Sequence, residues 1–239
     1  MPKHGKRYEA ALQKIDRSQL YSPEEAIKRL KECATAKFDE TVELHFRLGI
    51  DPRHSEQQIR STVLLPHGLG KEVRVLVFAE GEAARIAEEA GADIIADDEI
   101  IQKIEKEGWV DFDVALAVPE MMRKIGRLGK VLGRRGLMPN PKAGTLVQPE
   151  DLPRAIQEAR AGRLEFRNDR TGNVHVPIGK ASFDEKRLLD NMAAVVDAIR
   201  RNRPASAKGT YVKRLVLTST MGPGIRVDPN AALEMRAPE

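Results

Sequence analysis

The middle of the chain alternates between short apolar runs and amphipathic segments, and this order restricts the fold more than any other feature. Residues 73–79 form an almost continuous apolar run, as expected for a strand covered on both faces. Helical spacing follows at 82–90, a short strand at 93–96, a helix at about 98–107 and a further strand at 112–118. The sequence therefore predicts an α/β unit with short parallel strands.

The N-terminal part follows a different pattern. A short helix is expected at 6–15, and a second helix opens at Ser22, which can cap it, with Pro23 in its first turn. Strict alternation of apolar and polar residues over 38–50 then predicts a half-buried strand.

The C-terminal part returns to mixed elements. A helix, two strands, a long amphipathic helix and two more strands are expected in this order, at 151–161, 163–167, 173–178, 184–202, 211–219 and 225–227. A polar turn at 168–172 joins the first two strands. The tail after Pro229 shows no strong pattern.

Neither end of the chain contains enough elements for a core of its own. The economical solution is one split α+β domain built from residues 1–67 and 160–239, with a three-layer, Rossmann-like α/β domain of residues 68–159 inserted into it. The chain would cross between the two domains near 66–70 and again near 148–161. A connection of this kind permits hinge motion between the domains.

Charge is sorted along the chain. Residues 1–67 carry a net charge of +2, residues 160–239 carry +6, and residues 68–159 carry −4. Within the acidic middle, a glycine-rich loop holds seven cations and no acid, namely Arg123, Lys124, Arg127, Lys130, Arg134, Arg135 and Lys142. A polyanion would favour the two ends and this basic loop, which indicates nucleic-acid binding. An ordinary mixed surface is the alternative reading.

Several short motifs resemble catalytic or nucleotide-binding motifs, but the elements around them are not those that such motifs require. Gly68-Leu69-Gly70-Lys71 precedes a strand, whereas a phosphate-binding loop must follow a strand and open a helix. The glycines of the basic loop lack dinucleotide spacing, the five histidines lack paired ligand spacing, and no serine sits in a nucleophile elbow. We therefore expect no catalytic residue, metal or cofactor. A nucleotide-dependent enzyme that uses the middle domain and a protein-only scaffold remain as alternatives.

The sequence also indicates the cellular compartment in which the protein is found. Cys33 is the single cysteine, which excludes a disulfide framework. The N-terminus lacks the apolar core of a secretory signal, and apolar runs such as 75–79 are too short to cross a bilayer. We expect a cytoplasmic protein without a membrane partner.

Features that suit RNA lie on the predicted strands and their turns. The cations are Lys37, Arg47, Arg163, Arg167, Arg170 and Lys180, and Phe38 and Phe166 lie beside them. Each phenylalanine could stack on a base or pack in the core. Because aromatic residues make up only 4% of the chain, recognition of RNA shape, backbone and ribose hydroxyls fits better than stacking alone.

Five segments resemble the bacterial large-subunit ribosomal protein L-one family: IGRLGKVLGRRGLMPN at 125–140, MPKHGKRY at the start, TAKFDETVELH at 35–45, EFRNDRTG at 165–172 and TMGP at 220–223. The likeness runs from Met1 to about Val227. In two places the chain departs from the family, because Arg134 stands where proline is usual and the tail from Asp228 is longer.

The resemblance implies a structural constituent of the large ribosomal subunit with the split two-domain form. Such a protein binds the large-subunit ribosomal RNA stalk near the exit site, assists release of deacylated tRNA from that site, and represses translation through its own mRNA leader. It implies a protein that is monomeric off the ribosome.

The resemblance also implies three RNA-binding segments in the split domain. They are Lys37, Phe38, Thr41 and Glu43; Arg167, Asn168, Asp169, Arg170 and Thr171; and Thr220, Met221 and Gly222. Glu43 and Asp169 are expected to accept hydrogen bonds from ribose hydroxyls or base amino groups. Gly222 permits close approach of the backbone. The basic loop then becomes a second, weaker contact with backbone phosphates.

Overall fold

The computed structural model describes residues 5–236, and the chain divides into two compact units. The first unit combines residues 1–70 with residues 164–239, and the second consists of residues 71–163. Each unit has a hydrophobic core of its own. The first four residues of the segment MPKHGKRY lie outside the described residues.

A four-stranded antiparallel sheet is the centre of the first unit, with the order β7-β1-β8-β9. Its strands are β1 (Thr41–Leu48), β7 (Asn173–Lys180), β8 (Val212–Ser219) and β9 (Ile225–Val227). In the register, Leu44 lies opposite Val176 on one side and Leu217 on the other. Both parts of the first unit therefore contribute neighbouring strands to one sheet.

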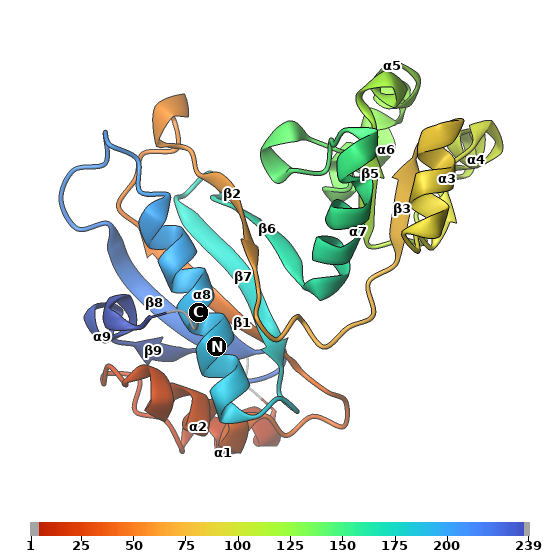
Figure 1. The fold of residues 1–239 in the computed structure, drawn as a ribbon. Helices are drawn as coiled ribbons and strands as arrows, with labels where there is room; N and C mark the ends of the chain where they lie inside the picture. The colour runs from red at the N-terminus through yellow and green to blue at the C-terminus, as the bar shows by residue number, and fades with distance from the viewer. Residues whose placement is uncertain (1–4, 237–239) are drawn as a thin grey trace. The chain divides into compact units, whose positions relative to one another are not determined.

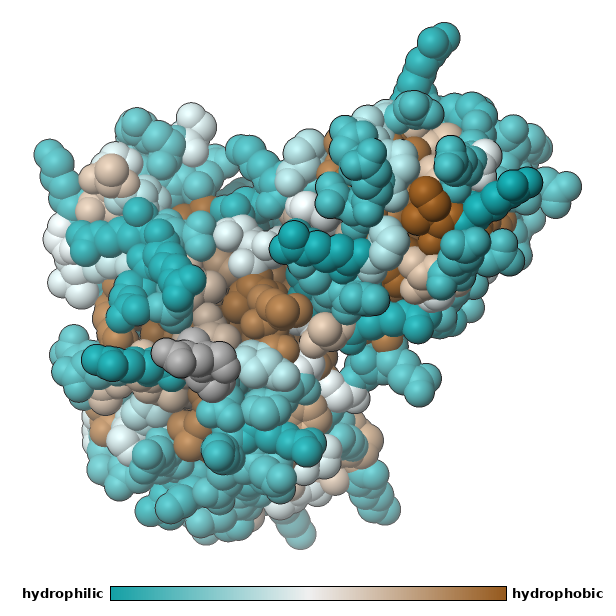
Figure 2. Space-filling model, viewed as in Figure 1, coloured by the Kyte–Doolittle hydropathy of each residue, from teal (hydrophilic) through white to brown (hydrophobic). Residues whose placement is uncertain are grey.

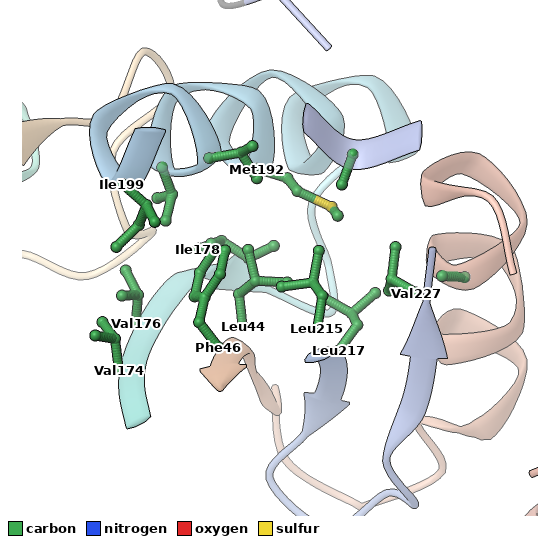
Figure 3. Packing of buried hydrophobic residues seen from close by; sticks show 14 of the residues in the cluster. Leu44, Phe46, Val174, Val176, Ile178, Met192, Ile199, Leu215, Leu217 and Val227 are labelled. Carbon is green, nitrogen blue, oxygen red and sulfur yellow. The ribbon is translucent and has the colours of Figure 1, made fainter. Parts of the chain in front are cut away.

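The alternation predicted for residues 38–50 is confirmed in β1. Its buried side chains are Val42, Leu44, Phe46 and Leu48, whereas Thr41, Glu43, His45 and Arg47 lie on the outer face of the sheet. The long helix α8 (Glu185–Arg201) lies across the inner face, where Met192 and Ile199 pack with the buried side chains of the strands (Figures 1 and 3).

Further elements complete the first unit. Helix α1 is Lys6–Leu12, shorter than predicted, and α2 is Pro23–Cys33. Ser22 accepts a hydrogen bond from the Glu25 amide at 3.3 Å, so the predicted cap is confirmed. A small sheet pairs β2 (Arg60–Leu64) with β6 (Arg163–Arg167), and a 3-10 turn precedes it at Ser55–Gln57.

The tail contains a helix that its sequence pattern did not reveal. Helix α9 spans Pro229–Glu234. The Asp228 carboxylate accepts a hydrogen bond from the Asn230 amide at 2.9 Å, and Ala232 is buried against the core. An aspartate followed by proline is a helix-start signal, but six residues are too few for helical periodicity to be visible.

In the second unit, the predicted order of short parallel strands and helices is confirmed. The sheet has the order β4-β3-β5, formed by β4 (Ile94–Ile95), β3 (Val75–Phe78) and β5 (Val114–Ala117). All four residues of β3 are buried, as its continuous apolar run predicts. Helices α3 (Glu82–Glu89), α4 (Asp98–Glu107) and α7 (Leu152–Ala161) contribute buried side chains to the same core.

The basic stretch of this unit is helical, so its description as a loop is wrong. After a 3-10 turn at Pro119–Met121 come α5 (Met122–Ile125), a 3-10 turn at Gly126–Leu128 and α6 (Gly129–Arg135), and further 3-10 turns lie at Pro141–Ala143 and Pro149–Asp151. The buried side chains of Met121, Ile125, Leu128 and Leu132 follow one another at steps of four, three and four residues. That spacing forms one apolar helical face, which outweighs the low helix propensity of the glycines.

One face of the molecule is shown in space-filling form in Figure 2. Hydrophilic side chains cover most of the face drawn in Figure 2, and hydrophobic ones gather in limited patches. Among the described residues, no helix has the length and apolar character needed to cross a membrane.

Candidate nucleic-acid interface

All three predicted RNA-binding segments lie in the first unit. The first segment leads into β1 and the third follows β8, and because these strands are antiparallel neighbours, the two segments meet at one end of the sheet. The second segment forms the turn between β6 and β7, at the other end of β1, where Arg47 lies opposite Asn173. Six residues separate Thr41 from Arg47, which corresponds to about 20 Å along a strand.

Direct backbone contacts join the first and third segments. The Thr41 amide donates to Oγ1 of Thr220 at 2.9 Å, and the Thr220 amide donates to the Thr41 carbonyl at 3.0 Å. These residues are 179 positions apart in the chain. The pairing therefore fixes two sequence-distant segments as one surface.

A buried carboxylate, Glu40, reinforces this junction. Only 2% of Glu40 is exposed, and its oxygens accept hydrogen bonds from the Ala36 amide at 2.9 Å, the Ser219 hydroxyl at 2.7 Å and the Met221 amide at 2.9 Å. Burial alone would raise the pKa of this carboxyl, but the hydrogen bonds outweigh burial and the pKa is lowered. Glu40 is therefore held as an anion that binds both segments.

Sequence reasoning missed Glu40, although a signal for it exists. The alternation of β1 places residue 40 on the same side of the strand as Val42 and Leu44, which are buried. A carboxylate that points inward requires hydrogen-bond donors, because an unpaired buried charge is costly. Two of those donors, at Ser219 and Met221, come from the end of β8 and the turn that follows it, and the sequence alone does not say that β8 lies beside β1.

Large apolar side chains are exposed at this junction. Phe38 is 54% exposed and Met221 is 49% exposed. Phe166, in contrast, is 1% exposed and belongs to the core, so of its two possible roles core packing is correct. A Cβ atom at Gly222 would clash with Oγ of Ser219, which explains why glycine stands next to Met221.

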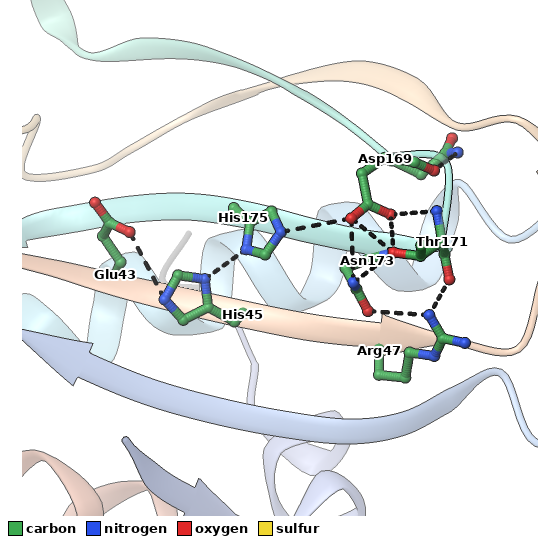
Figure 4. Close-up of polar contacts among 8 residues, drawn as sticks. Glu43, His45, Arg47, Asp169, Thr171, Asn173 and His175 are labelled. Carbon is green, nitrogen blue, oxygen red and sulfur yellow. Dashed lines mark hydrogen bonds and ion pairs between the residues drawn. The ribbon is translucent and has the colours of Figure 1, made fainter. Parts of the chain in front are cut away.

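The second segment is organised by Asp169. Its carboxylate accepts hydrogen bonds from the amide and hydroxyl of Thr171 and from the amide and side chain of Asn173, at 2.8–3.1 Å (Figure 4). Desolvation of the carboxyl group raises its pKa, but the hydrogen bonds from Asn173 and Thr171 have the larger effect. They keep the pKa of Asp169 far below its ordinary value. Both carboxylate oxygens are engaged within the turn, so Asp169 shapes the turn, and its role as an acceptor for ribose hydroxyls or base amino groups stays a prediction.

Other side chains fix the turn to its neighbours. Oδ1 of Asn168 accepts a hydrogen bond from the Ile59 amide at 2.6 Å, and Arg47 donates to the Thr171 carbonyl and to Oδ1 of Asn173. A hollow of about 820 Å³ lies here, and its lining includes the exposed residues Arg167 and Arg170. The second segment thus combines a rigid turn, two exposed guanidinium groups and a concave surface.

A row of polar side chains connects the two ends of the outer face. Nδ1 of His45 lies 2.7 Å from Nδ1 of His175, Glu43 lies 3.6 Å from Nε2 of His45, and Asp169 lies 3.9 Å from Nε2 of His175 (Figure 4). Burial, and secondly the neighbouring His175, lower the pKa of His45. Both histidines occupy the polar face of their strands, as predicted.

The basic stretch of the second unit is partly neutralised by acids of the same unit. Lys124 pairs with Glu80 and with Asp98, and Arg127 lies 3.4 Å from Glu105. The hydrogen bond to Glu80 is the main reason that the pKa of Lys124 is raised. The other five cations, which have no ion pair among residues 5–236, are Arg123, Lys130, Arg134, Arg135 and Lys142.

Chemically, these surfaces are suited to binding. Across the described range, no group of three or more histidine, cysteine, aspartate or glutamate side chains is placed to hold a metal ion. The first unit instead offers a rigid sheet with exposed apolar side chains, guanidinium groups and a carboxylate along one face. The fold and this face define a mixed α/β protein built for contact with a large, polar partner.

Comparison with known proteins identifies the family. Residues 30–223 match the Ribosomal protein L1p/L10e family, and the chain belongs to it. Large ribosomal subunit protein uL1 of Chloroflexus aurantiacus is 58% identical over 99% of this chain and 100% of its own length. The uL1 proteins of Chloroflexus aggregans and Dehalococcoides mccartyi are 59% identical (95% of this chain, 96% of theirs) and 56% identical (98% and 99%).

Family membership confirms the resemblance seen in the sequence. The chain is a structural, non-enzymatic protein of the large ribosomal subunit, and its place is the ribosome in the cytoplasm.

Proposed function

We propose that the first unit binds the large-subunit ribosomal RNA stalk near the exit site through a composite surface made of the three segments 37–43, 167–171 and 220–222. The observation that carries this proposal is the junction around Glu40, which fixes Phe38, Thr220 and Met221 at one place before any RNA is bound. A preformed surface binds without the entropic cost of ordering its loops.

The chemistry of the composite surface suits folded RNA. Phe38 and Met221 offer apolar faces to an unstacked base or a ribose, as single-stranded parts of structured RNA require. The Glu43 side chain is 43% exposed, and although one of its oxygens lies 3.6 Å from Nε2 of His45, the carboxylate remains able to accept from ribose hydroxyls. Arg167 and Arg170 lie beside the rigid turn and can meet backbone phosphates.

The second unit adds a weaker contact in this proposal. The parallel sheet β4-β3-β5 with its helices supports describing the unit as a Rossmann-like domain inserted into a split α+β domain. Its unpaired cations, among them Arg134 and Arg135, would meet backbone phosphates. Through these surfaces the protein would contact exit-site tRNA and assist its release.

The composite surface would also bind the leader of the protein's own mRNA and repress translation. This follows if the leader presents an RNA fold like that of the stalk, because a preformed surface selects shape and ribose positions rather than the origin of the RNA. The free protein would act as a monomer.

Replacement of Phe38 by alanine tests the composite surface. Base–aromatic stacking is worth about 1–3 kcal/mol per base, so Phe38→Ala should weaken binding of a stalk transcript by about 5- to 150-fold. Leu64→Ala is the matched control, because Leu64 is 51% exposed in the same unit but lies outside the three segments. Nuclease footprinting of the stalk transcript with each variant shows which nucleotides the protein contacts. Equal affinity of the two variants would refute the proposal.

A further inference from the structure

A cluster of arginine side chains lies on the outer face of the four-stranded sheet, at residues outside the three segments of the composite surface. Arg214 on β8, Arg226 on β9 and Arg17 between α1 and α2 line a hollow of about 320 Å³. Tyr8, Val216, Pro223 and Gly224 complete its lining. This volume lies within the range of pockets that accept small molecular groups.

The strand register brings the two sheet arginines together. Val216 lies opposite Arg226, and Arg214 precedes Val216 by two residues, so all three side chains lie on one face of the sheet. Leu215 and Leu217, on the other face, are buried in the core. Arg214 could not turn inward without a one-residue slip of β8 that would expose these leucines.

Among residues 5–236, no carboxylate forms an ion pair with these three arginines. The nearest acids in the sequence are occupied, because Asp16 accepts from Ser18 and Asp228 accepts from the Asn230 amide. Nε of Arg226 is removed from solvent and has no hydrogen-bond partner within the described part of the chain. Guanidinium groups placed together in this way attract an anion.

The arginine pocket adjoins the composite surface. A second hollow on the same face is lined by His45, Arg47, Asn173, His175, Lys213 and Arg214, so the two hollows share Arg214. Arg47 lies opposite Arg214 in the register and donates to the carbonyl of Thr171 in the second segment. A continuous basic track therefore runs from the second segment across β1 and β8 to Arg226.

We propose that this arginine pocket binds a backbone phosphate of the same RNA, an inference that rests on the proposed function and extends its footprint across the sheet. The planar fork of a guanidinium group matches the paired oxygens of a phosphodiester. The order of the arginines across neighbouring strands supports a phosphate backbone, because a chain of repeated anions can meet Arg47, Arg214 and Arg226 one after another.

The salt dependence of RNA binding tests the pocket. The double variant Arg17→Ala/Arg214→Ala removes two of its cations, and each lost phosphate contact lowers the slope of log K against log salt concentration by about 0.7–0.9. Affinity for a stalk transcript is measured over a series of KCl concentrations. Arg187→Ala is the control, because Arg187 is an exposed cation without an ion pair among the described residues, on the helix that packs against the inner face of the sheet.

The expected result is a shallower slope for the double variant and an unchanged slope for Arg187→Ala. Slopes equal to that of the wild type in both variants would overturn the arginine pocket, while binding by the wild type would leave the proposed function standing. Failure of the wild type to bind the transcript would instead refute the proposed function, and the pocket with it. If the double variant melts below the wild type, Arg17→Ala alone gives the same test, with a slope change of about one phosphate contact.

Discussion

Replacement of Glu40 by glutamine keeps the size of the side chain and halves its capacity to accept hydrogen bonds. In the protein, Oε1 accepts from the Ala36 amide, while Oε2 accepts from the Ser219 hydroxyl and the Met221 amide. A glutamine that turns its carbonyl oxygen toward Ser219 and Met221 must turn its NH2 group toward the Ala36 amide. The variant therefore leaves at least one partly buried donor without a partner.

The size of the effect follows from this count. One buried donor left unpaired costs about 1–3 kcal/mol, and the two remaining bonds lose the strengthening that an ionised acceptor gives. A loss of about 2–3 kcal/mol in the free energy of unfolding is therefore expected. For a chain of this length that corresponds to a melting temperature lower by about 5–10 °C.

Thermal melts recorded by circular dichroism at a series of pH values supply the measurement. The native pKa of Glu40 is lowered, so the native state releases this proton more readily than the unfolded chain. Its stabilising contribution is complete above the ordinary pKa of 4.5 and is lost as the pH falls through the native value. The difference between the wild type and Glu40→Gln should therefore shrink on acidification below that pH.

Glu43→Gln is the matched control for this experiment. Glu43 lies three residues further on, in β1; its side chain is 43% exposed and points to the outer face. Its replacement should change stability by no more than about 0.5 kcal/mol. If Glu40→Gln melts at the temperature of Glu43→Gln, the buried carboxylate does not hold the two segments together.

Three further predictions concern the turn, the histidine pair and the basic helix. Asp169→Ala should cost about 1 kcal/mol at neutral pH, reduced by partial exposure, and weaken RNA binding. Because the native pKa of Asp169 is lowered, the stability difference in thermal melts should begin to shrink below pH 3.8 and be lost as the pH falls through the native value, and a constant difference would contradict this prediction. Since the native pKa of His45 is lowered, stability should be complete above about pH 6.5 and decline as the pH falls through the native value, and melts of His45→Asn should lack this part of the decline. Arg134→Ala/Arg135→Ala should reduce the salt slope of RNA binding by about 0.7–0.9 per lost contact, whereas Lys124→Ala, whose charge is already paired, should change it less.

Hydrophobic periodicity was sufficient to predict most of the architecture. Alternation identified β1, a continuous apolar run identified β3, and the Ser22 cap marked the start of α2. The same principle could have identified the helices of the basic stretch, where Ile125, Leu128 and Leu132 keep helical spacing. The five glycines of that stretch directed the prediction to a loop, because glycine lowers intrinsic helix propensity; burial of an apolar face decides the outcome instead.

The composite surface was less accessible to reasoning from one sequence. The resemblance supplied its segments, but the junction between Thr41 and Thr220 depends on strand pairing across 179 positions, which local patterns do not encode. Asp169 shows the same limit in a different way. From the sequence, the Asp169 carboxylate looks like an acceptor that is free to bind a partner. In the folded chain, the turn brings Thr171 and Asn173 to this carboxylate, which then holds the turn together.

The position of β1 between β7 and β8 makes the proposed composite surface a late product of folding. Until β8 is in place, the carboxylate of Glu40 lacks its donors at Ser219 and Met221, and nothing holds Thr220 against Thr41. Arg214 and Arg226 likewise reach the outer face only when β8 and β9 have paired. A growing chain therefore cannot display the composite surface before residue 222 has been added, and under the proposed function recognition of RNA would have to wait for completion of the first unit's sheet.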